Sequence, residues 1–332
     1  MKITHEMIAA EAGVSQSTVS KALRDSGEIS DKTALRIRNI AEQMGYFKEK
    51  KARLRRTMEY LYPHVAVLVP EIIGWSYALA VTSLQNRIEA IGGTVQIYLT
   101  KFDEARFSIL VDRLNRESFA DIILSFVAYT YTGRSRLPIG YMTGHSPEDP
   151  NCAFSVSADV AGGYEDAVRH LYKLGHRKIG FLGEENTTIK QQFFCDAMEK
   201  CGCRIRREWL IKTQSRFEQI GHDGVAAMCA LSAMPTALIT AYDEVAFGAV
   251  RELRRRGFRV PEDISVVGCN DTHSAACMDP PLTTIRIHSE ARTDAVVRLI
   301  CAVLEGNPLS VEEKHLSLPA PLIIRESTCR SR

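Results

Sequence analysis

Short apolar runs alternate with helix-like segments through most of this 332-residue chain. The apolar runs, each rich in residues that favour strands, are Val65–Val69, Val95–Leu99, Ile122–Leu124, Ile179–Leu182, Ala237–Ile239 and Ile264–Val267. The helix-like stretches between them include Tyr77–Ala90, Phe107–Arg116, Gly163–Leu174 and Val245–Arg256. Alternation of this kind predicts βαβ units with mostly parallel sheets. Because the runs fall into two groups of three, we expect two α/β lobes with a ligand cleft between them, at the carboxyl ends of the strands.

The first 45 residues have the pattern of three short helices. An apolar-periodic segment, Thr4–Ala12, ends at Gly13, and a second begins at Ser15, whose hydroxyl suits the N-cap position. A third covers Ser30–Met44 and is ended by Gly45. Two short helices joined by a tight turn containing glycine predict a helix-turn-helix, whose second helix can enter the major groove of DNA. An ordinary helical hairpin would give the same local pattern, so the surrounding sequence has to decide between the two.

This N-terminal part has its own expected core and its own polar rim. The apolar positions expected to form the core are Ile8, Val14, Val19, Leu23, Ile29, Leu35, Ile37 and Ile40. The short polar side chains near the start of the second segment are Gln16, Ser17, Thr18 and Ser20. Such side chains suit hydrogen bonds to bases and phosphates. The pattern therefore predicts a small all-α headpiece with a DNA-reading edge.

Charge is distributed unevenly along the chain. The formal net charge is only +2 over the whole sequence, whereas residues 1–60 hold twelve Lys and Arg against eight Asp and Glu. The excess is concentrated in Lys48, Lys50, Lys51, Arg53, Arg55 and Arg56. A charge run is commonly a solvated face or a linker, but this one directly follows the expected helix-turn-helix. Its position favours an arm that contacts DNA phosphates.

Several classes of protein are disfavoured by what the sequence lacks. No apolar run approaches the roughly 20 residues that a membrane helix needs, and the first residues carry no apolar signal core. Nine cysteines are scattered without a paired framework, and Cys201-Gly202-Cys203 has no partners at zinc spacing. We find no phosphate-binding loop, dinucleotide fingerprint or nucleophile elbow. The sequence thus predicts a cytoplasmic binding protein with no enzymatic activity, no cofactor and no metal.

Six sequence blocks, in their order and spacing, resemble a known family. They are Ala12–Ser20, Ile29–Tyr46, Asp159–Ile179, Pro235–Gly248, Val260–Gly268 and Asp271–Ile285. Together they resemble the LacI/GalR family of bacterial transcription regulators over nearly the whole chain. The resemblance implies a homodimeric repressor that binds an inverted-repeat operator in double-stranded DNA. It also implies a core like that of periplasmic sugar-binding proteins, where a small effector, by default a carbohydrate, changes operator affinity. A solute-binding protein with weak or non-specific DNA binding is the alternative.

The resemblance also divides the chain into parts. The helix-turn-helix headpiece would cover residues 1–47, a basic hinge 48–60, and the effector-binding and dimerisation core 61–332. Within the core, the N-lobe would take about 61–156 plus 286–316, and the C-lobe about 157–285 plus 317–332. The chain would cross between the lobes near 155–158, 284–287 and 316–318. An effector held between the lobes would therefore touch segments far apart in the sequence.

In the headpiece, the resemblance assigns base contacts to Gln16, Ser17 and Lys21 of the second helix. Glutamine can bridge N6 and N7 of adenine, and lysine can reach O6 and N7 of guanine. Contacts to phosphates, or alternatively roles in helix capping, are expected of Thr18, Ser20 and Arg24. These residues make up the predicted DNA-reading edge.

The hinge departs from the family pattern. Members commonly carry Pro-Asn after the Gly-Tyr pair. They also carry a Leu three residues after an Ala, and this Leu wedges into the minor groove. Here Lys48 and Glu49 replace Pro-Asn, while Leu54 comes one residue early and Arg55 stands at the wedge position. The residues expected to contact DNA here are Lys51, Arg53, Leu54 and Arg55. We therefore expect a hinge that binds more through phosphate charge, with any wedge in a shifted register.

For the effector site, the resemblance points first to Lys190 and Asp243. Lys190 stands where relatives place an Arg that binds the effector. A Lys keeps the positive charge but cannot form the bidentate hydrogen bonds of a guanidinium. Asp243 matches a position that accepts hydrogen bonds from effector hydroxyls, although it would equally cap the helix that follows it. Further candidates in loops at strand ends are Asp271, Trp75, Arg216 and Phe217. An aromatic side chain in a loop is more often there for packing, which is the alternative for Trp75 and Phe217.

Overall fold

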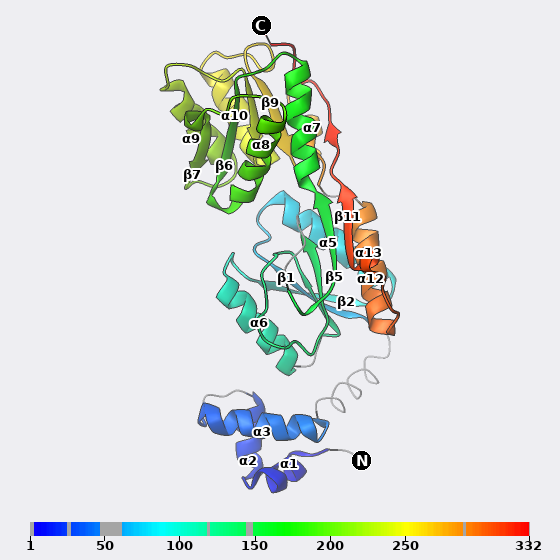
Figure 1. Cartoon of the computed structure of the whole chain (residues 1–332). Coiled ribbons are helices and arrows are strands. Elements are labelled where there is room, and N and C mark those ends of the chain that lie inside the picture. Colours follow the sequence, from blue (N-terminus) through cyan, green and yellow to red (C-terminus); the bar gives the residue numbers. More distant parts are fainter. Residues whose placement is uncertain are drawn as a thin grey trace.

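The computed structural model of the chain describes residues 3–24, 28–46, 62–117, 120–143, 149–287 and 290–331. A helical headpiece precedes two α/β lobes, each built on a largely parallel sheet (Figure 1). This arrangement confirms the predicted fold class. The predicted hinge at residues 48–60, with its expected DNA contacts Lys51, Arg53, Leu54 and Arg55, lies outside the described residues.

The headpiece consists of α1 (His5–Ala12), α2 (Gln16–Arg24) and α3 (Asp31–Gln43). Its buried side chains are Ile8, Ala9, Ala12, Val19, Ala22, Ala34, Ile37 and Ala41, with Val14, Leu23, Ile29 and Ile40 packed against them. The prediction that Leu35 belongs to this core is wrong, because the side chain is 59% exposed. Ala34, Ile37 and Ala41 form the inward stripe of α3, and a residue one position away from Ala34 is rotated about 100° off that stripe.

Two arginines of α3 fix the ends of the other headpiece helices. Arg36 Nη2 donates to the backbone oxygen of Ala12, the last residue of α1, at 2.8 Å. Arg38 Nε donates to the backbone oxygen of Ala22, near the end of α2, at 2.9 Å. The last carbonyls of a helix have no partner within the helix, so these donors satisfy groups that would otherwise need water. The orientation of α2 is therefore set by α3.

The sheet of the N-lobe consists of parallel strands. In spatial order they are β11 (His315–Pro319), β5 (Cys152–Asp159), β4 (Ile139–Thr143), β3 (Ile122–Ser125), β1 (His64–Val69) and β2 (Thr94–Leu99). Alternate residues of β1 serve the two faces, since Val65, Val67 and Val69 pack with α5 (Trp75–Ala90) and α12 (Glu290–Glu305). Ala66 and Leu68 pack with α6 (Glu104–Glu117). Helices thus cover both faces, as parallel sheets require.

The sheet of the C-lobe has the same doubly wound design. In spatial order its strands are β12 (Leu322–Ile323), β10 (Thr283–Ile285), β9 (Ser265–Cys269), β8 (Ala237–Thr240), β6 (Ile179–Glu184) and β7 (Leu210–Thr213). All pairings are parallel except that of β12 with β10. The helices of this lobe are α7 (Val160–Lys173), α8 (Thr188–Lys200), α9 (Glu218–Cys229), α10 (Asp243–Arg255) and α11 (His273–Cys277). Short 3-10 turns, η1 (Glu185–Thr187) and η2 (Arg207–Trp209), precede α8 and β7.

The chain passes between the lobes at several places within the described residues. Strand β5 of the N-lobe leads directly into α7 of the C-lobe (Figure 1). The chain leaves β10 for α12, which packs in the N-lobe, and β11, preceded by α13 (Val311–Lys314), leads to β12 in the C-lobe. Segments from distant parts of the sequence therefore hold the two lobes together at one edge.

Candidate functional site

A cavity of about 130 Å³ lies between the lobes, where strands of both sheets end. The N-lobe contributes Glu71 after β1, Gly74, Ser76 and Tyr77 at the start of α5, and Phe102 after β2. The C-lobe contributes Glu184, Asn186, Thr187, Lys190, Arg216, Phe217, Tyr242, Glu244 and Asn270. Ligands of open α/β sheets bind off the carboxyl ends of the strands. The cavity thus lies where the fold places a small-molecule site.

Arg216 joins the two lobes across this cavity. It follows β7 in the C-lobe, yet its Nη1 and Nη2 donate to Oε2 and Oε1 of Glu71 in the N-lobe, at 3.2 and 2.5 Å. Its Nε lies 2.7 Å from Oε2 of Glu184, a buried carboxylate at the end of β6. The guanidinium also lies over the rings of Phe102 and Phe217, 5.4 and 4.9 Å from their centroids. One cation therefore holds a carboxylate from each lobe.

Tyr242 extends this network, and the backbone around it is strained. Its Oη donates to Oε1 of Glu184 at 3.1 Å and accepts from the backbone N–H of Phe217 at 3.1 Å. Burial raises the pKa of the Glu184 carboxyl. The backbone φ is 58° at Phe102, 56° at Phe217 and 119° at Asn270, a region that non-glycine residues rarely adopt. Strain of this kind gathers at functional sites, so its presence in three lining residues supports a binding role for the cavity.

Asp243 and Glu244 are neighbours in sequence with different surroundings. Asp243 is fully buried and does not line the cavity: Oδ2 accepts from the backbone N–H of Thr272 at 2.7 Å, and Oδ1 from Oγ1 of Thr284 at 2.5 Å. Glu244 does line the cavity, and its Oε1 accepts from the backbone N–H of Trp75 across the lobes at 3.4 Å. The predicted effector contact of Asp243 stays a prediction, while Glu244 is the carboxylate of this pair that reaches the cavity.

Asp243→Asn is expected to stabilise the protein most at high pH. Burial raises the pKa of the Asp243 carboxyl to about 7, although hydrogen bonds from Thr284 and Thr272 oppose this. In the unfolded chain an Asp titrates near 4. Between about pH 4 and pH 7 the Asp243 carboxyl therefore holds a proton in the folded state that it has lost in the unfolded chain. As the pH rises through that window, this carboxyl lowers the free energy of unfolding by an increasing amount. Asparagine removes the charge and keeps an oxygen for the N–H of Thr272.

Thermal unfolding at two pH values measures this effect. We expect Asp243→Asn to raise the midpoint temperature by about 3 °C or more at pH 8 and by much less at pH 4.5. Asp196→Asn on the exposed face of α8 is the control, since it removes the same charge from a solvated site. Equal shifts at the two pH values would contradict the proposed cause.

The other predicted effector residues divide into two groups. Lys190 lines the cavity with Arg216 and Phe217, and its Nζ donates to the backbone oxygen of Ala241 at 2.8 Å and lies 3.7 Å from Sγ of Cys269. The side chains of Asp271 and Trp75 are not among those that line the cavity. The structure therefore brings together three of the predicted residues.

Asp271 and Trp75 have other surroundings. Oδ2 of Asp271 lies 2.6 Å from Nε of Arg286, and Oδ1 lies 2.6 Å from Nη2 of Arg325. These arginines follow β10 and β12, so the carboxylate ties together two segments at the lobe crossings. Trp75 is 43% exposed, and only its backbone N–H is bound by Glu244. Their predicted contacts with an effector remain predictions.

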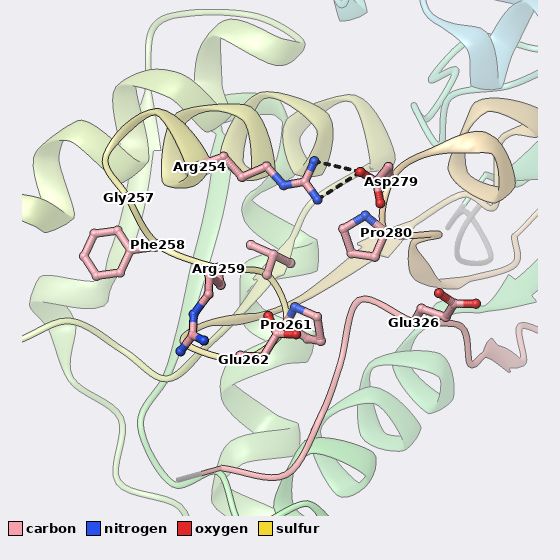
Figure 2. A pocket seen from close by; sticks show the side chains of 10 residues that line it. Arg254, Gly257, Phe258, Arg259, Pro261, Glu262, Asp279, Pro280 and Glu326 are labelled. Carbon is pink, nitrogen blue, oxygen red and sulfur yellow. Dashed lines mark hydrogen bonds and ion pairs between the residues drawn. The ribbon is translucent and has the colours of Figure 1, made fainter.

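A larger hollow of about 670 Å³ lies elsewhere on the C-lobe, beyond the end of α10 (Figure 2). Arg254 and Asp279 pair across its rim at 3.2 Å, and the side chain of Asp279 is 90% exposed. Figure 2 shows its lining side chains grouped around Pro261 and Pro280. Exposed, mutually paired charges gain little from a ligand. The cavity between the lobes, with its buried polar groups, is the better candidate.

No group of three or more His, Cys, Asp or Glu side chains in the described ranges is placed to hold a metal ion. Within those same ranges, no helix has the length and apolar character needed to cross a bilayer.

The edge of the headpiece predicted to read DNA is formed by the start of α2. Ser15 Oγ accepts from the backbone N–H of Thr18 at 3.1 Å, which is the expected N-cap. Gln16 and Ser17 are exposed. Nζ of Lys21, one turn further on, pairs with Oε2 of Glu28 at 2.6 Å. The side chain of Arg24 lies outside the described part of the chain, and Thr18 and Ser20 are half-buried.

Sequence reasoning missed several residues of the cavity between the lobes. They are Glu71, Tyr77, Phe102, Glu184, Tyr242, Glu244 and Asn270. Each stands at or just after the carboxyl end of a strand, or at the start of the helix that follows. Listing every polar or aromatic residue at those positions would have found most of them. The positions that match motifs of the relatives do not include them.

Two parts of the chain match known families. Residues 6–49 match the family described as bacterial regulatory proteins, lacI family. Residues 168–328 match the periplasmic binding protein-like domain. The first match covers the helix-turn-helix, and the second covers most of the C-lobe together with α12 and β11.

Individual relatives match nearly the whole length. The HTH-type transcriptional regulator DegA of Bacillus subtilis is 29% identical over 99% of this chain and 98% of its own. The repressor PurR of Mannheimia succiniciproducens is 26% identical over 96% and 97%. The lac repressor dimer bound to operator and an anti-inducer gives a TM-score of 0.71 at 21% identity, covering 99% of this chain and 100% of that one. A CelR–cellobiose complex gives 0.66 at 22%, covering 98% and 100%. The structural matches establish the fold.

Proposed function

We propose that this chain, which belongs to the LacI family of bacterial regulatory proteins, is a sequence-specific DNA-binding repressor controlled by a small effector. The observation that carries this proposal is that one chain combines an exposed helix start in a helix-turn-helix with a cavity walled by two lobes. An effector that prefers one lobe arrangement shifts the population towards it, and linkage carries this to DNA affinity. A carbohydrate is the default effector. The role is binding without a catalytic step, as a dimer in the cytoplasm.

The proposed division of labour follows the sequence prediction. Residues 1–47 form the headpiece, 48–60 the hinge and 61–332 the core, with the lobe boundaries given above. We assign base contacts to Gln16, Ser17 and Lys21. Effector contacts are assigned first to Lys190, Arg216 and Phe217, which line the cavity. Asp243, Asp271 and Trp75 stay proposed effector contacts, although they are not among the residues that line the cavity.

Selection of binding sites from random duplex DNA tests this function. The full-length protein is used at a stated salt concentration, because phosphate contacts make affinity strongly salt-dependent. Enrichment of an inverted repeat is expected, since a dimer places two recognition helices about one helical turn apart on the DNA. A single unrepeated motif would contradict the dimer. A pool without any enriched motif would contradict sequence-specific reading and favour a protein that only binds a solute.

Lys21→Ala is expected to weaken binding to the selected operator by about 1–3 kcal/mol and to relax the preference at one base pair. Lysine at this position can reach O6 and N7 of guanine once it leaves Glu28. Equilibrium binding to the operator and to single-base variants measures both effects. Lys173→Ala on α7 is the control, because it removes the same charge from the C-lobe. An equal loss on every sequence would show that Lys21 contacts a phosphate.

A further inference from the structure

We infer that the ligand of the cavity between the lobes presents hydrogen-bond donors and carries no anionic group, and that Glu244 accepts one of those donors. This rests on the proposed function, because it concerns the same cavity. The inference narrows the effector to polyhydroxyl compounds that are neutral or positively charged. Sugar phosphates and sugar acids are excluded.

The charges that line the cavity favour such a ligand. Three carboxylates line it, Glu71, Glu184 and Glu244, against two cations, Arg216 and Lys190. Glu184 and Glu244 are at most 6% exposed, so water screens them little. A further anion in the same cavity would be repelled by these carboxylates and would also lose its hydration. An ammonium is also desolvated, but the carboxylates attract it, and a set of hydroxyls carries no charge to desolvate.

Arg216 is already paired with carboxylates of the protein, and Lys190 is partly occupied by a backbone oxygen. Both terminal nitrogens of Arg216 bind Glu71, and its Nε faces Glu184. Nζ of Lys190 donates to the backbone oxygen of Ala241. An anionic ligand could reach Arg216 only by displacing one of these carboxylates. That would leave a buried negative charge without its partner, which is strongly unfavourable.

Glu244, in contrast, has a carboxylate oxygen that no donor of the described residues reaches. The side chain is buried, and its Oε1 accepts a long hydrogen bond, 3.4 Å, from the backbone N–H of Trp75. Its Oε2 is buried as well and makes no hydrogen bond to another described residue. Buried polar atoms are nearly always paired, and leaving one unpaired is costly. A ligand hydroxyl or ammonium would supply the missing donor.

The remaining lining groups are compatible with this ligand. The amides of Asn186 and Asn270 can both donate and accept, so they suit hydroxyl groups without selecting a charge. Tyr77, Phe102 and Phe217 present rings, whose faces attract cations and repel anions. The cavity volume, about 130 Å³, is below the roughly 300 Å³ of common ligand sites. The volume therefore favours a small ligand.

A ligand panel tests the class of compound. Thermal unfolding of the full-length protein is followed at pH 8, because burial raises the pKa of Glu244 and the inference concerns its carboxylate. The panel holds common hexoses and disaccharides, the matching amino sugars, 6-phosphates and uronates, and inorganic phosphate as a bare anion. We expect the midpoint to rise by about 3 °C or more only with neutral or cationic members. A rise with any anionic member, or with no neutral or cationic member, overturns the inference.

Variants of Glu244 test the proposed acceptor. With the most effective panel member, Glu244→Gln is expected to weaken ligand binding by about 10- to 100-fold, measured by calorimetry. Glu199→Gln on the exposed face of α8 is the control and is expected to bind as the wild type does. Should the Gln variant unfold, Glu244→Asp carries the test, because its shorter side chain moves the acceptor by one methylene. Unchanged affinity in the folded variant overturns the assignment.

The proposed repressor function and the inferred class of ligand are tested by different measurements. DNA binding by the wild-type protein without ligand is measured by the selection described above, and its absence would count against the repressor function alone. The ligand panel and the Glu244 variants require no DNA. A protein that binds its operator but responds only to a sugar phosphate would keep the proposed function and lose this inference.

Discussion

Gly248→Ala is expected to destabilise the C-lobe by about 3 kcal/mol, at the upper end of overpacking effects. The backbones of α9 and α10 touch at this point: a Cβ on Gly248 would collide with the backbone oxygen of Glu218, and a Cβ on Gly221 with that of Val245. Alanine is the better helix former by about 1 kcal/mol, but that gain is smaller than the cost of forcing two helices apart. Since the obstacle is backbone, no change of rotamer relieves it.

Thermal unfolding measures the effect. For a lobe of this size we expect the midpoint to fall by about 6–12 °C. Ala227→Ser on the exposed face of α9 is the control, because it adds one atom where nothing is packed against it. A second consequence is functional, since α10 begins with Asp243 and Glu244 and carries one wall of the cavity. A Gly248→Ala protein with unchanged midpoint would show that the helices can separate cheaply.

The fold was predictable to the extent that local pattern determines it. The apolar runs at β1, β3, β6, β8 and β9 are central strands, buried on both faces, and these give the strongest sequence signal. β4 and β5 mix Gly, Ser and Tyr with apolar residues, so no run marks them, although both are largely buried between neighbours. The edge strand β11 alternates exposed and half-buried residues over only five positions. Such segments become strands through their neighbours in the sheet.

The site was predictable where it repeats a pattern of relatives or lies in a loop that follows a strand. Lys190 was found in this way, and Arg216 and Phe217 were found as loop residues at a strand end. The partner of Arg216 could not be read from the chain, because Glu71 is 145 residues away and belongs to the other lobe. The choice between Asp243 and Glu244 also depends on three dimensions. A helix start points one of two adjacent carboxylates into the protein and the other into the cavity, and sequence does not tell which.

Arg216→Met is expected to be the most damaging single change in the cavity. It removes the cation between Glu71 and Glu184 and leaves two carboxylates from opposite lobes without it. Breaking a buried ion pair costs about 3–5 kcal/mol. Because Arg216 is 36% exposed, we expect a smaller loss, of about 2–3 kcal/mol. The loss falls on the contact between the two lobes that wall the cavity, so ligand binding weakens together with stability.

The pH dependence separates this mechanism from simple loss of packing. Burial already raises the pKa of Glu184, and Arg216 opposes that rise more than the hydrogen bond from Tyr242 or the charge of Lys190, so its removal raises the pKa further. At low pH the carboxyl is protonated and neutral, so the variant should approach the wild type there and fall furthest below it at pH 8. Thermal unfolding at pH 5 and pH 8 measures this. Arg254→Met is the matched control, since it breaks an exposed pair with Asp279 that contributes little. If the two variants lose the same amount at both pH values, Arg216 does not hold the lobes together.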